Sequence, residues 1–370
     1  MDMKKAFLAM LIALCLLFSG CTGWMDGSYS SVYPFTERGH QNNDQIVSVS
    51  NYTQLRQTLA GLVEGNGESV LLNVAQMDQS RIADDMQRAI SHVLENTPIG
   101  AYAVEKITYE QGTRAGQNVL FVTATYNHNR PEILRMKRAR SMEDVKTLVS
   151  NAMDQCEARV VLVAESYQNL DLAQFVKNYA DENPDIIMEM PQVTVNMYPE
   201  RGTARVLEIV FSYQTNRDNL RNMQSRVRPL FTSAELYVSG NHADQEKYAQ
   251  LYAFLMERHE YTLETSITSS YSLLVHGVGD SKAFATVYAA MCRRAGLKCM
   301  VVSGTCEGEP LFWNMIKVGD RYAHVDLLRS SREAHFAMWT DEEMAGYVWD
   351  YSAYPACKPP QSVGPSDVQE

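Results

Sequence analysis

The sequence predicts an α+β protein in which two tandem α/β modules precede a third, different α+β domain. Three observations indicate this fold. Strand-like apolar segments recur at a fixed interval in the middle of the chain, helices with one apolar stripe lie between them, and the last third follows another pattern. The chain has 370 residues, 45% of them hydrophobic. That length suits two or three domains of about 100–200 residues, and the composition argues against disorder.

The charge balance excludes one class of partner. The chain has 33 basic and 44 acidic residues, a net charge of −11. Because a nucleic-acid backbone requires a basic surface, we expect no nucleic-acid partner. The seven cysteines are too few for a disulfide scaffold of this length.

Residues 1–20 are predicted to be a lipoprotein signal peptide. Lys4 and Lys5 precede an apolar run, 6–18, which is too short to span a bilayer but suits a signal-peptide core. Small residues then precede Cys21, as in the bacterial lipobox, where the thiol receives a lipid. We therefore expect the protein to be exported and anchored by its lipid on the outer face of the bacterial cell membrane. A plain secretory signal is the alternative.

Two segments are expected to lack fixed structure. Residues 21–50 are rich in Gly, Ser, Asn and Tyr and show no periodicity, which indicates a flexible tether. Residues 359–370 are expected to form a flexible tail.

The middle of the chain carries a tandem duplication, with modules at 51–140 and 141–230. The strand pattern that begins at Val119 returns 87 residues later at Val206, and the pair Asn129-Arg130 returns as Asn216-Arg217. Each module is predicted to contain a helix, a strand, a second helix and a hairpin. The predicted helices and single strands are 52–63, 70–74 and 79–95 in the first module, and 142–153, 160–164 and 170–182 in the second.

These modules contain no metal-binding motif, phosphate-binding loop or nucleophile motif, so their expected role is structural or adhesive. The basic run Arg135–Arg140 could contact anionic wall polymer or lipid headgroups. A solvated helix between the modules is the simpler interpretation of this run. A partner-binding role for the whole duplicated region is a further hypothesis.

The C-terminal region, 231–358, carries two spaced motifs. The first includes Gly277, Phe284-Ala285, Ala295-Gly296-Leu297, Cys299 and Val302-Ser303-Gly304. It resembles the nucleophile segment of the bacterial transglutaminase-like domains of the papain-type, cysteine-protease superfamily. The second begins Leu311-Phe312-Trp313-Asn314 and reaches Asp326 fifteen residues after Leu311, which resembles the family pattern H-A-W-N followed by W-Y-x-V-D.

The resemblance implies a degenerate triad at Ser281, Leu311 and Asp326. The nucleophilic cysteine is replaced by Ser281 and the histidine by Leu311, while the aspartate is retained. Acyl transfer on this fold uses a thiolate at a helix N-terminus, a histidine that activates it and a carboxylate that orients the histidine. The expected function is therefore binding or scaffolding of a peptide, cell-wall or glycan ligand, without a cofactor.

Several alternatives remain open. His324, two residues before Asp326, is a candidate substitute base, which would make the domain a serine-variant hydrolase or acyltransferase. Cys292 is expected to be a packing thiol. One disulfide among Cys299, Cys306 and Cys357 is plausible in an exported protein. A zinc site is weaker still, because no C-x-x-C spacing occurs.

The cleft of such a domain would remain available to a ligand after the catalytic residues are lost. Trp313, Asn314 and Phe284 are the predicted cleft residues, with aromatic side chains offering contacts to peptide or glycan.

Overall fold

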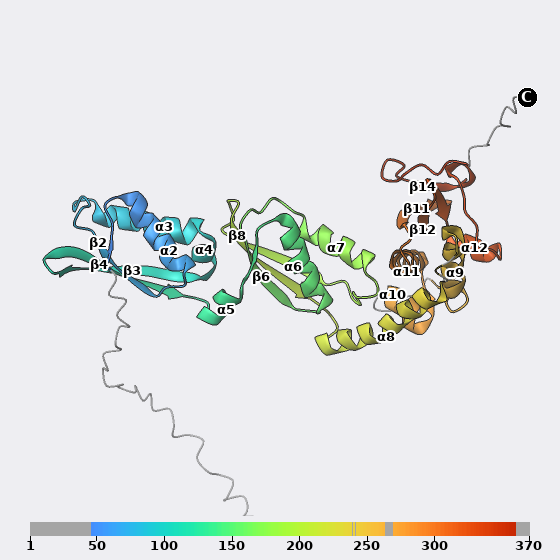
Figure 1. Ribbon diagram of the computed structural model, residues 1–370, viewed down its shortest axis with the longest axis horizontal. Coiled ribbons are helices and arrows are strands. Elements are labelled where there is room, and N and C mark those ends of the chain that lie inside the picture. The colour runs from blue at the N-terminus through green and yellow to red at the C-terminus, as the bar shows by residue number, and fades with distance from the viewer. Residues whose placement is uncertain (1–45, 239, 241, 263–268, 360–370) are drawn as a thin grey trace, which may run out of the picture. The chain divides into compact units, whose positions relative to one another are not determined.

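The computed structural model describes residues 46–238, 240, 242–262 and 269–359 (Figure 1). The predicted signal peptide, the lipidation site at Cys21, most of the tether and nearly all of the tail lie outside these residues. Within them, no helix is long and apolar enough to cross a membrane.

The first α/β region is a four-stranded sheet with helices on one face (Figure 1). The sheet has the strand order β1-β2-β4-β3, and β4 is antiparallel to both of its neighbours. Leu120, Val122 and Ala124 are buried on β4, whereas Phe121 between them is exposed. This alternation is what a half-buried strand requires. The elements are β1 (Ile46–Ser48), α2 (Tyr52–Glu64), β2 (Ser69–Asn73), α3 (Ile82–Asn96), α4 (Pro98–Ala103), β3 (Val104–Arg114) and β4 (Gln117–Tyr126).

The predicted tether extends too far along the chain. β1 lies inside the range 21–50, and Asn51 caps α2 by accepting a hydrogen bond from Gln54 N at 3.0 Å. Ser50 N donates to Gln54 Oε1 at 2.9 Å. These side-chain bonds to the first turn fix the start of the helix, so the folded region begins before residue 50.

The second α/β region has the strand order β5-β6-β8-β7. β5 pairs with β6 in parallel, and β8 is antiparallel to β6 and β7. The order of strands along the sheet matches that of the first region, position by position. The elements are α5 (Arg130–Arg135), β5 (Lys137–Ala139), α6 (Met142–Asp154), β6 (Arg159–Ala164), α7 (Leu172–Glu182), β7 (Gln192–Tyr198) and β8 (Arg205–Ser212).

The basic run Arg135–Arg140 is not a helix, contrary to the simpler interpretation of the sequence. Arg135 ends the short α5, and Lys137–Ala139 form β5 at the edge of the second sheet. Edge strands commonly carry basic side chains, which discourage pairing with other chains. The run therefore has a structural reason for its charge.

The boundary predicted between residues 230 and 231 falls inside a helix. α8 runs from Arg217 to Tyr237, and its N-cap, Asn216, follows the second sheet closely. Val227 and Phe231 of α8 are fully buried in the core that also contains the C-terminal helices. The last part of α8 thus belongs to the packing of the C-terminal region.

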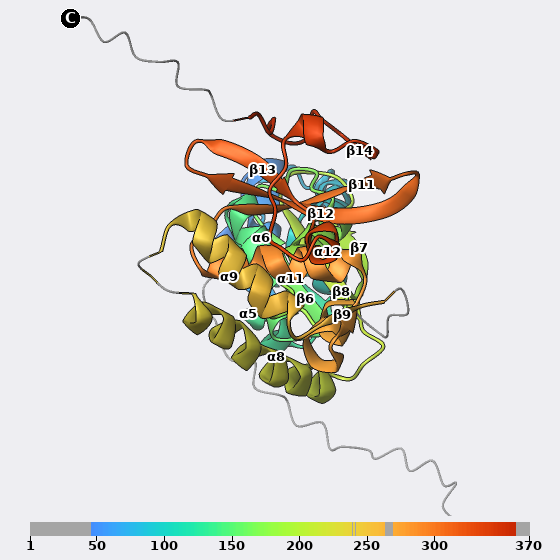
Figure 2. The same cartoon turned by 90° about the vertical axis from the view of Figure 1, so that its right-hand side faces the viewer.

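The C-terminal region is an antiparallel sheet, β13-β12-β11-β14, with helices against one face (Figure 2). Ile316 and Val325 pack with the helices, whereas Trp313 and Met315 pack on the opposite face with the last segments of the chain. The elements are α9 (Asp244–Met256), β9 (Glu260–Tyr261), α10 (Ser269–Tyr271), a π-helix (Ser272–His276), β10 (Val278–Gly279), α11 (Ser281–Arg294), β11 (Cys299–Cys306), β12 (Glu309–Val318), β13 (Arg321–Val325), α12 (Leu327–Arg332), a 3₁₀ turn (Asp341–Glu343) and β14 (Tyr347–Trp349).

Candidate functional site

Ser281 occupies the first position of α11, where the sequence motif predicts a nucleophile. Asp280 is the N-cap, and its carboxylate accepts a hydrogen bond from Ala283 N at 2.8 Å. Gly279 lies against the helix, because a Cβ there would approach Ala283 Cβ to 3.0 Å. The cap and the close approach place the Ser281 side chain at the helix N-terminus, where the helix dipole favours negative charge. The residue is 8% exposed.

The start of β12 lies beside Ser281. Phe312 N donates to Ser281 Oγ over 3.3 Å, so Leu311 and Phe312 lie next to the nucleophile position. Leu311 pairs with Gly304 on β11 and packs against the cores on both faces of the sheet. The structure therefore brings the Ser281 position and the start of β12, where Leu311 lies, together.

Asp326 is hydrogen-bonded to groups other than an imidazole. As the N-cap of α12, its Oδ1 accepts from Leu328 N at 2.9 Å and from Arg329 N at 3.1 Å. Its Oδ2 accepts from the Tyr347 hydroxyl at 2.6 Å. Burial and this hydrogen bond raise the pKa of the Tyr347 phenol, so the proton stays on tyrosine. Asp326 thus caps a helix and holds β14.

His324, the candidate substitute base, lies on the face of the sheet opposite α11 and Ser281. Side chains alternate between the faces of a strand, and His324 packs with Trp313 on the face opposite α11. Trp313 Nε1 donates to His324 Nδ1 at 2.9 Å, and His324 Nε2 lies 2.9 Å from Asp341 Oδ1. Asp326 is not on the same strand as predicted, because β13 ends at Val325 and Asp326 caps the helix that follows.

The hydrogen bonds fix the tautomer of His324. An indole N–H can only donate, so Nδ1 must accept and Nε2 must carry the proton that goes to Asp341. Burial lowers the pKa of His324, while its hydrogen bond to Asp341 opposes this shift. The imidazole is therefore neutral around pH 7.

His324, Asp341 and Cys357 place one potential metal ligand each within 4.8 Å of one another. These are donor types that zinc accepts. A metal at Nε2 would, however, displace the proton while Trp313 still donates to Nδ1, and the ring would become an imidazolate. The Cys357 backbone N–H also donates to Asp341 Oδ2 at 3.0 Å. The cluster is consequently built to share protons and not to bind a cation.

The three predicted cleft residues do not line an open cleft. Trp313, Asn314 and Phe284 are 1%, 0% and 1% exposed. Asn314 Nδ2 donates to Ala285 O at 2.8 Å and thereby ties β12 to α11. Its Oδ1 has no hydrogen-bond partner among the residues that the structure describes. Phe284 and Asn314 lie between the sheet and the helices, whereas Trp313 is buried in the core on the opposite face.

The predicted disulfide is absent from the described residues, in which all five cysteines are free. Cys292 and Cys299 are buried, and Cys306 is partly exposed. Cys357 is buried beside Asp341, and burial raises its pKa to about 12. Burial also raises the pKa of Cys292, so Cys292 and Cys357 stay protonated and serve packing.

A cavity of about 750 Å³, which no sequence motif indicated, borders α11 one residue beyond Ser281. Its walls come from α7, the segment 184–193, the end of β8, and Lys282 and Thr286 of α11. Lys282 Nζ forms an ion pair with Asp181 Oδ1 at 2.8 Å. Because the walls are far apart in sequence, no local pattern marks this cavity.

Comparison with known structures finds distant similarities. The chain covers 61% of a structure described as a TGase, at 11% identity over 56% of this chain, with a TM-score of 0.26. A candidate cysteine protease from Cytophaga hutchinsonii aligns at 13% identity over 43% of this chain and 70% of its own, with a TM-score of 0.24. A candidate protease from Parabacteroides distasonis aligns at 9% identity over 70% and 40%, with a TM-score of 0.23. No curated protein matches.

A family model matches part of the C-terminal region. Residues 232–327 match the transglutaminase-like superfamily, a range that includes Ser281, Leu311 and Asp326. The helix that begins at Ser281 and the antiparallel sheet beside it are the elements on which the motif positions lie. The chain therefore contains a transglutaminase-like domain in its C-terminal part.

Proposed function

We propose that the transglutaminase-like domain is catalytically degenerate and acts as a binding or scaffolding module. The observation that carries this proposal is the hydrogen bond from Phe312 N, the residue after Leu311, to the Ser281 hydroxyl. The Ser281 hydroxyl lies beside β12, where Leu311 stands in the place of the catalytic histidine. A serine hydroxyl needs a base within hydrogen-bond reach to attack a carbonyl, and an alkyl side chain supplies none.

Asp326 and His324 make structural hydrogen bonds, which support this proposal. Asp326 holds α12 and Tyr347, and His324 is bonded to Trp313 and Asp341. Recruitment of either residue for catalysis would break hydrogen bonds to buried groups, which is costly. Loss of a single triad member already lowers turnover by about 10⁴-fold in such enzymes.

The cavity beside Lys282 is the proposed ligand-binding place. It combines apolar walls, such as Ile187 and Val193, with the charged Lys282 and Glu189. Mixed walls of this kind suit an extended peptide, including a peptide of the cell wall, because apolar contacts supply affinity and the few charges supply orientation.

We propose further that Cys21 is lipid-modified and anchors the exported protein to the outer face of the membrane. The motivating observation is the signal-like run that ends at Cys21. On this proposal the two α/β regions, with their matching strand orders, act as duplicated spacer or adhesive modules. Cys21→Ala should release the protein from the membrane fraction and abolish labelling by a palmitate analogue. Unchanged labelling would overturn the anchor.

A serine-reactive probe tests the degenerate site directly. The folded protein should not react with a fluorophosphonate at Ser281, and the Ser281→Ala variant should give the same background. Labelling of Ser281 that disappears in the Ser281→Ala variant would instead support a serine-variant hydrolase or acyltransferase.

Restoration of the two substituted positions tests the register. Ser281→Cys with Leu311→His should react with iodoacetamide faster than Ser281→Cys alone, because an imidazole then lies beside a thiol at a helix N-terminus. Cys292 serves as an internal control, since it stays buried and protonated. Equal rates for the single and double variants would show that residues 281 and 311 do not face each other.

A further inference from the structure

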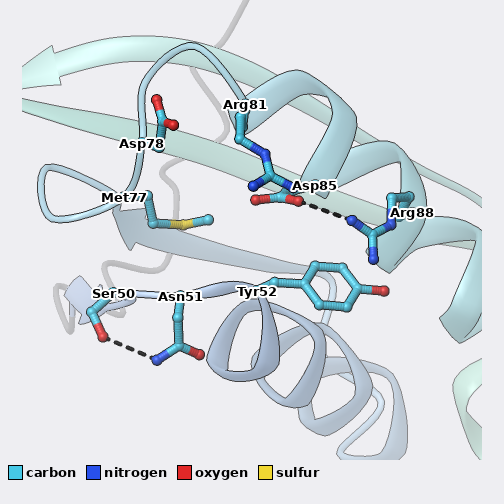
Figure 3. A pocket seen from close by; sticks show the side chains of 8 residues that line it. All are labelled: Ser50, Asn51, Tyr52, Met77, Asp78, Arg81, Asp85 and Arg88. Atoms are coloured by element: carbon cyan, nitrogen blue, oxygen red, sulfur yellow. Dashed lines mark hydrogen bonds and ion pairs between the residues drawn. The ribbon is translucent and has the colours of Figure 1, made fainter.

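A second cavity lies in the first α/β region, far along the chain from the transglutaminase-like domain. Its volume is about 380 Å³, and it opens between the beginnings of α2 and α3. Figure 3 shows that side chains from α3 extend toward the start of α2 across this cavity. Its lining residues are Ser50, Asn51, Tyr52, Met77, Asp78, Arg81, Asp85 and Arg88. Nothing in the proposed function uses them.

Asp85 is the central residue of this cavity. It is 8% exposed, yet the only hydrogen bond or ion pair of its carboxylate within the described residues is a 3.4 Å bond from Arg88 to Oδ1. A carboxylate can accept about four hydrogen bonds, and buried carboxylates normally find strong donors. Asp85 thus has unused acceptor capacity at the wall of a cavity.

Two guanidinium groups flank Asp85. Arg81, Asp85 and Arg88 share one face of α3, since they are four and three residues apart (Figure 3). The Arg88 guanidinium stacks over the Tyr52 ring, 4.4 Å from the ring centroid, which holds it in place. No hydrogen bond or ion pair joins the Arg81 guanidinium to the part of the chain that the structure describes.

Asp78 completes the charge pattern at the rim. Hydrogen bonds from Ser80 lower the pKa of this carboxyl, and the charge of Arg81 contributes to the same shift. Asp78 is therefore ionised, and the cavity presents two cations and two anions. A simple anion would meet both carboxylates, and a simple cation would meet both guanidiniums, so neither class fits alone.

We propose that this cavity binds the head group of an α-amino acid. The ligand carboxylate binds Arg81 and Arg88, whose planar guanidiniums suit bidentate contacts, and the ligand ammonium binds Asp85. Tyr52 and Met77 provide an apolar wall for a ligand side chain of moderate size. The opposite charges of the ligand are adjacent, as are those of Asp85 and its flanking arginines.

Ligand-observed NMR on the mature full chain tests this proposal with l-leucine and d-leucine as probes. At least one enantiomer should bind at ~10 mM or below. N-acetylleucine, which lacks the ammonium, and leucinamide, which lacks the carboxylate, should each bind at least about tenfold more weakly, because each loses charge-assisted hydrogen bonds. Absence of binding by both enantiomers, or equal binding by a blocked form, would overturn the proposal.

Variants locate the site. Arg81→Gln and Asp85→Asn should each weaken binding by about tenfold or more. Arg56→Gln is the matched control, because Arg56 lies on α2 but does not line the cavity. The thermal transition of each variant shows whether it remains folded. Leucine binding that survives Arg81→Gln in a folded protein, or that falls equally in the Arg56→Gln control, would contradict this site.

Discussion

On the face of the C-terminal sheet that packs against α11, Ser281 accepts one hydrogen bond of 3.3 Å from Phe312 N. On the opposite face, His324 has both ring nitrogens bonded at 2.9 Å. The first face lies against α11, which begins at Ser281. The second face carries the contacts that hold residues 339–357. The buried His324 thus has shorter hydrogen bonds than the Ser281 hydroxyl at the start of α11.

Disruption of the hydrogen bonds of His324 should reduce the free energy of unfolding most. His324→Leu leaves the buried Trp313 N–H without an acceptor and removes one hydrogen bond from Asp341, so the free energy of unfolding should fall by about 3 kcal/mol. Urea unfolding measures this change. His335→Leu is the control, because His335 is exposed, and it should stay within about 0.5 kcal/mol of the unaltered protein. Equal losses of unfolding free energy in the two variants would show that the His324 hydrogen bonds do not stabilise the fold.

The Tyr347–Asp326 hydrogen bond should have an intermediate effect. Tyr347→Phe removes a 2.6 Å bond to a buried carboxylate and should cost about 2 kcal/mol. Tyr351→Phe alters a neighbouring tyrosine that is exposed and should cost less than about 0.5 kcal/mol. A Tyr347→Phe protein as stable as the control would mean that α12 alone satisfies Asp326.

The pH dependence of stability should report on His324. Burial lowers its pKa in the folded protein, so the unfolded chain binds a proton first as the pH falls below about 6.5. Stability should therefore be full above this pH and decrease toward the folded pKa. His259, whose pKa burial also lowers, contributes a similar loss. Chemical unfolding at pH 7.5 and 5.5 should show a smaller loss for His324→Gln, and an unchanged loss would assign the effect to other groups.

The smallest effect is expected at the nucleophile position. Ser281→Ala removes only a weak 3.3 Å hydrogen bond, so the free energy of unfolding should change by less than about 1 kcal/mol. The same unfolding experiment measures it. A loss similar to that of His324→Leu would show that both faces depend equally on their polar groups.

The sequence was informative where local pattern and structure coincide. The motif spacing identified the helix that begins at Ser281, and the structure places the start of β12 beside it. The strand patterns at Val119 and Val206 fall on β4 and β8, which hold the same position in two sheets. Such features depend on periodicity and caps, which neighbouring residues determine.

The features that the sequence did not predict depend on tertiary packing. Spacing alone suggested that His324 and Asp326 lie on one strand, but the strand ends at Val325 and Asp326 caps the next helix. Trp313 looked suitable for a cleft, yet an aromatic residue on a strand serves a core equally well, and here it is buried. Each cavity is lined by segments from several elements, and no local sequence pattern predicts contacts between such distant segments.

The continuous helix α8 has a consequence for how the protein unfolds. Because α8 starts directly after the second sheet and ends in the core of the transglutaminase-like domain, melting of one region removes part of the other's interior. The second sheet and the C-terminal region should therefore lose structure in one cooperative transition. A truncated chain that begins at residue 231 would cut α8 and strip Val227 from that interior, so its solubility would suffer for reasons unrelated to ligand binding.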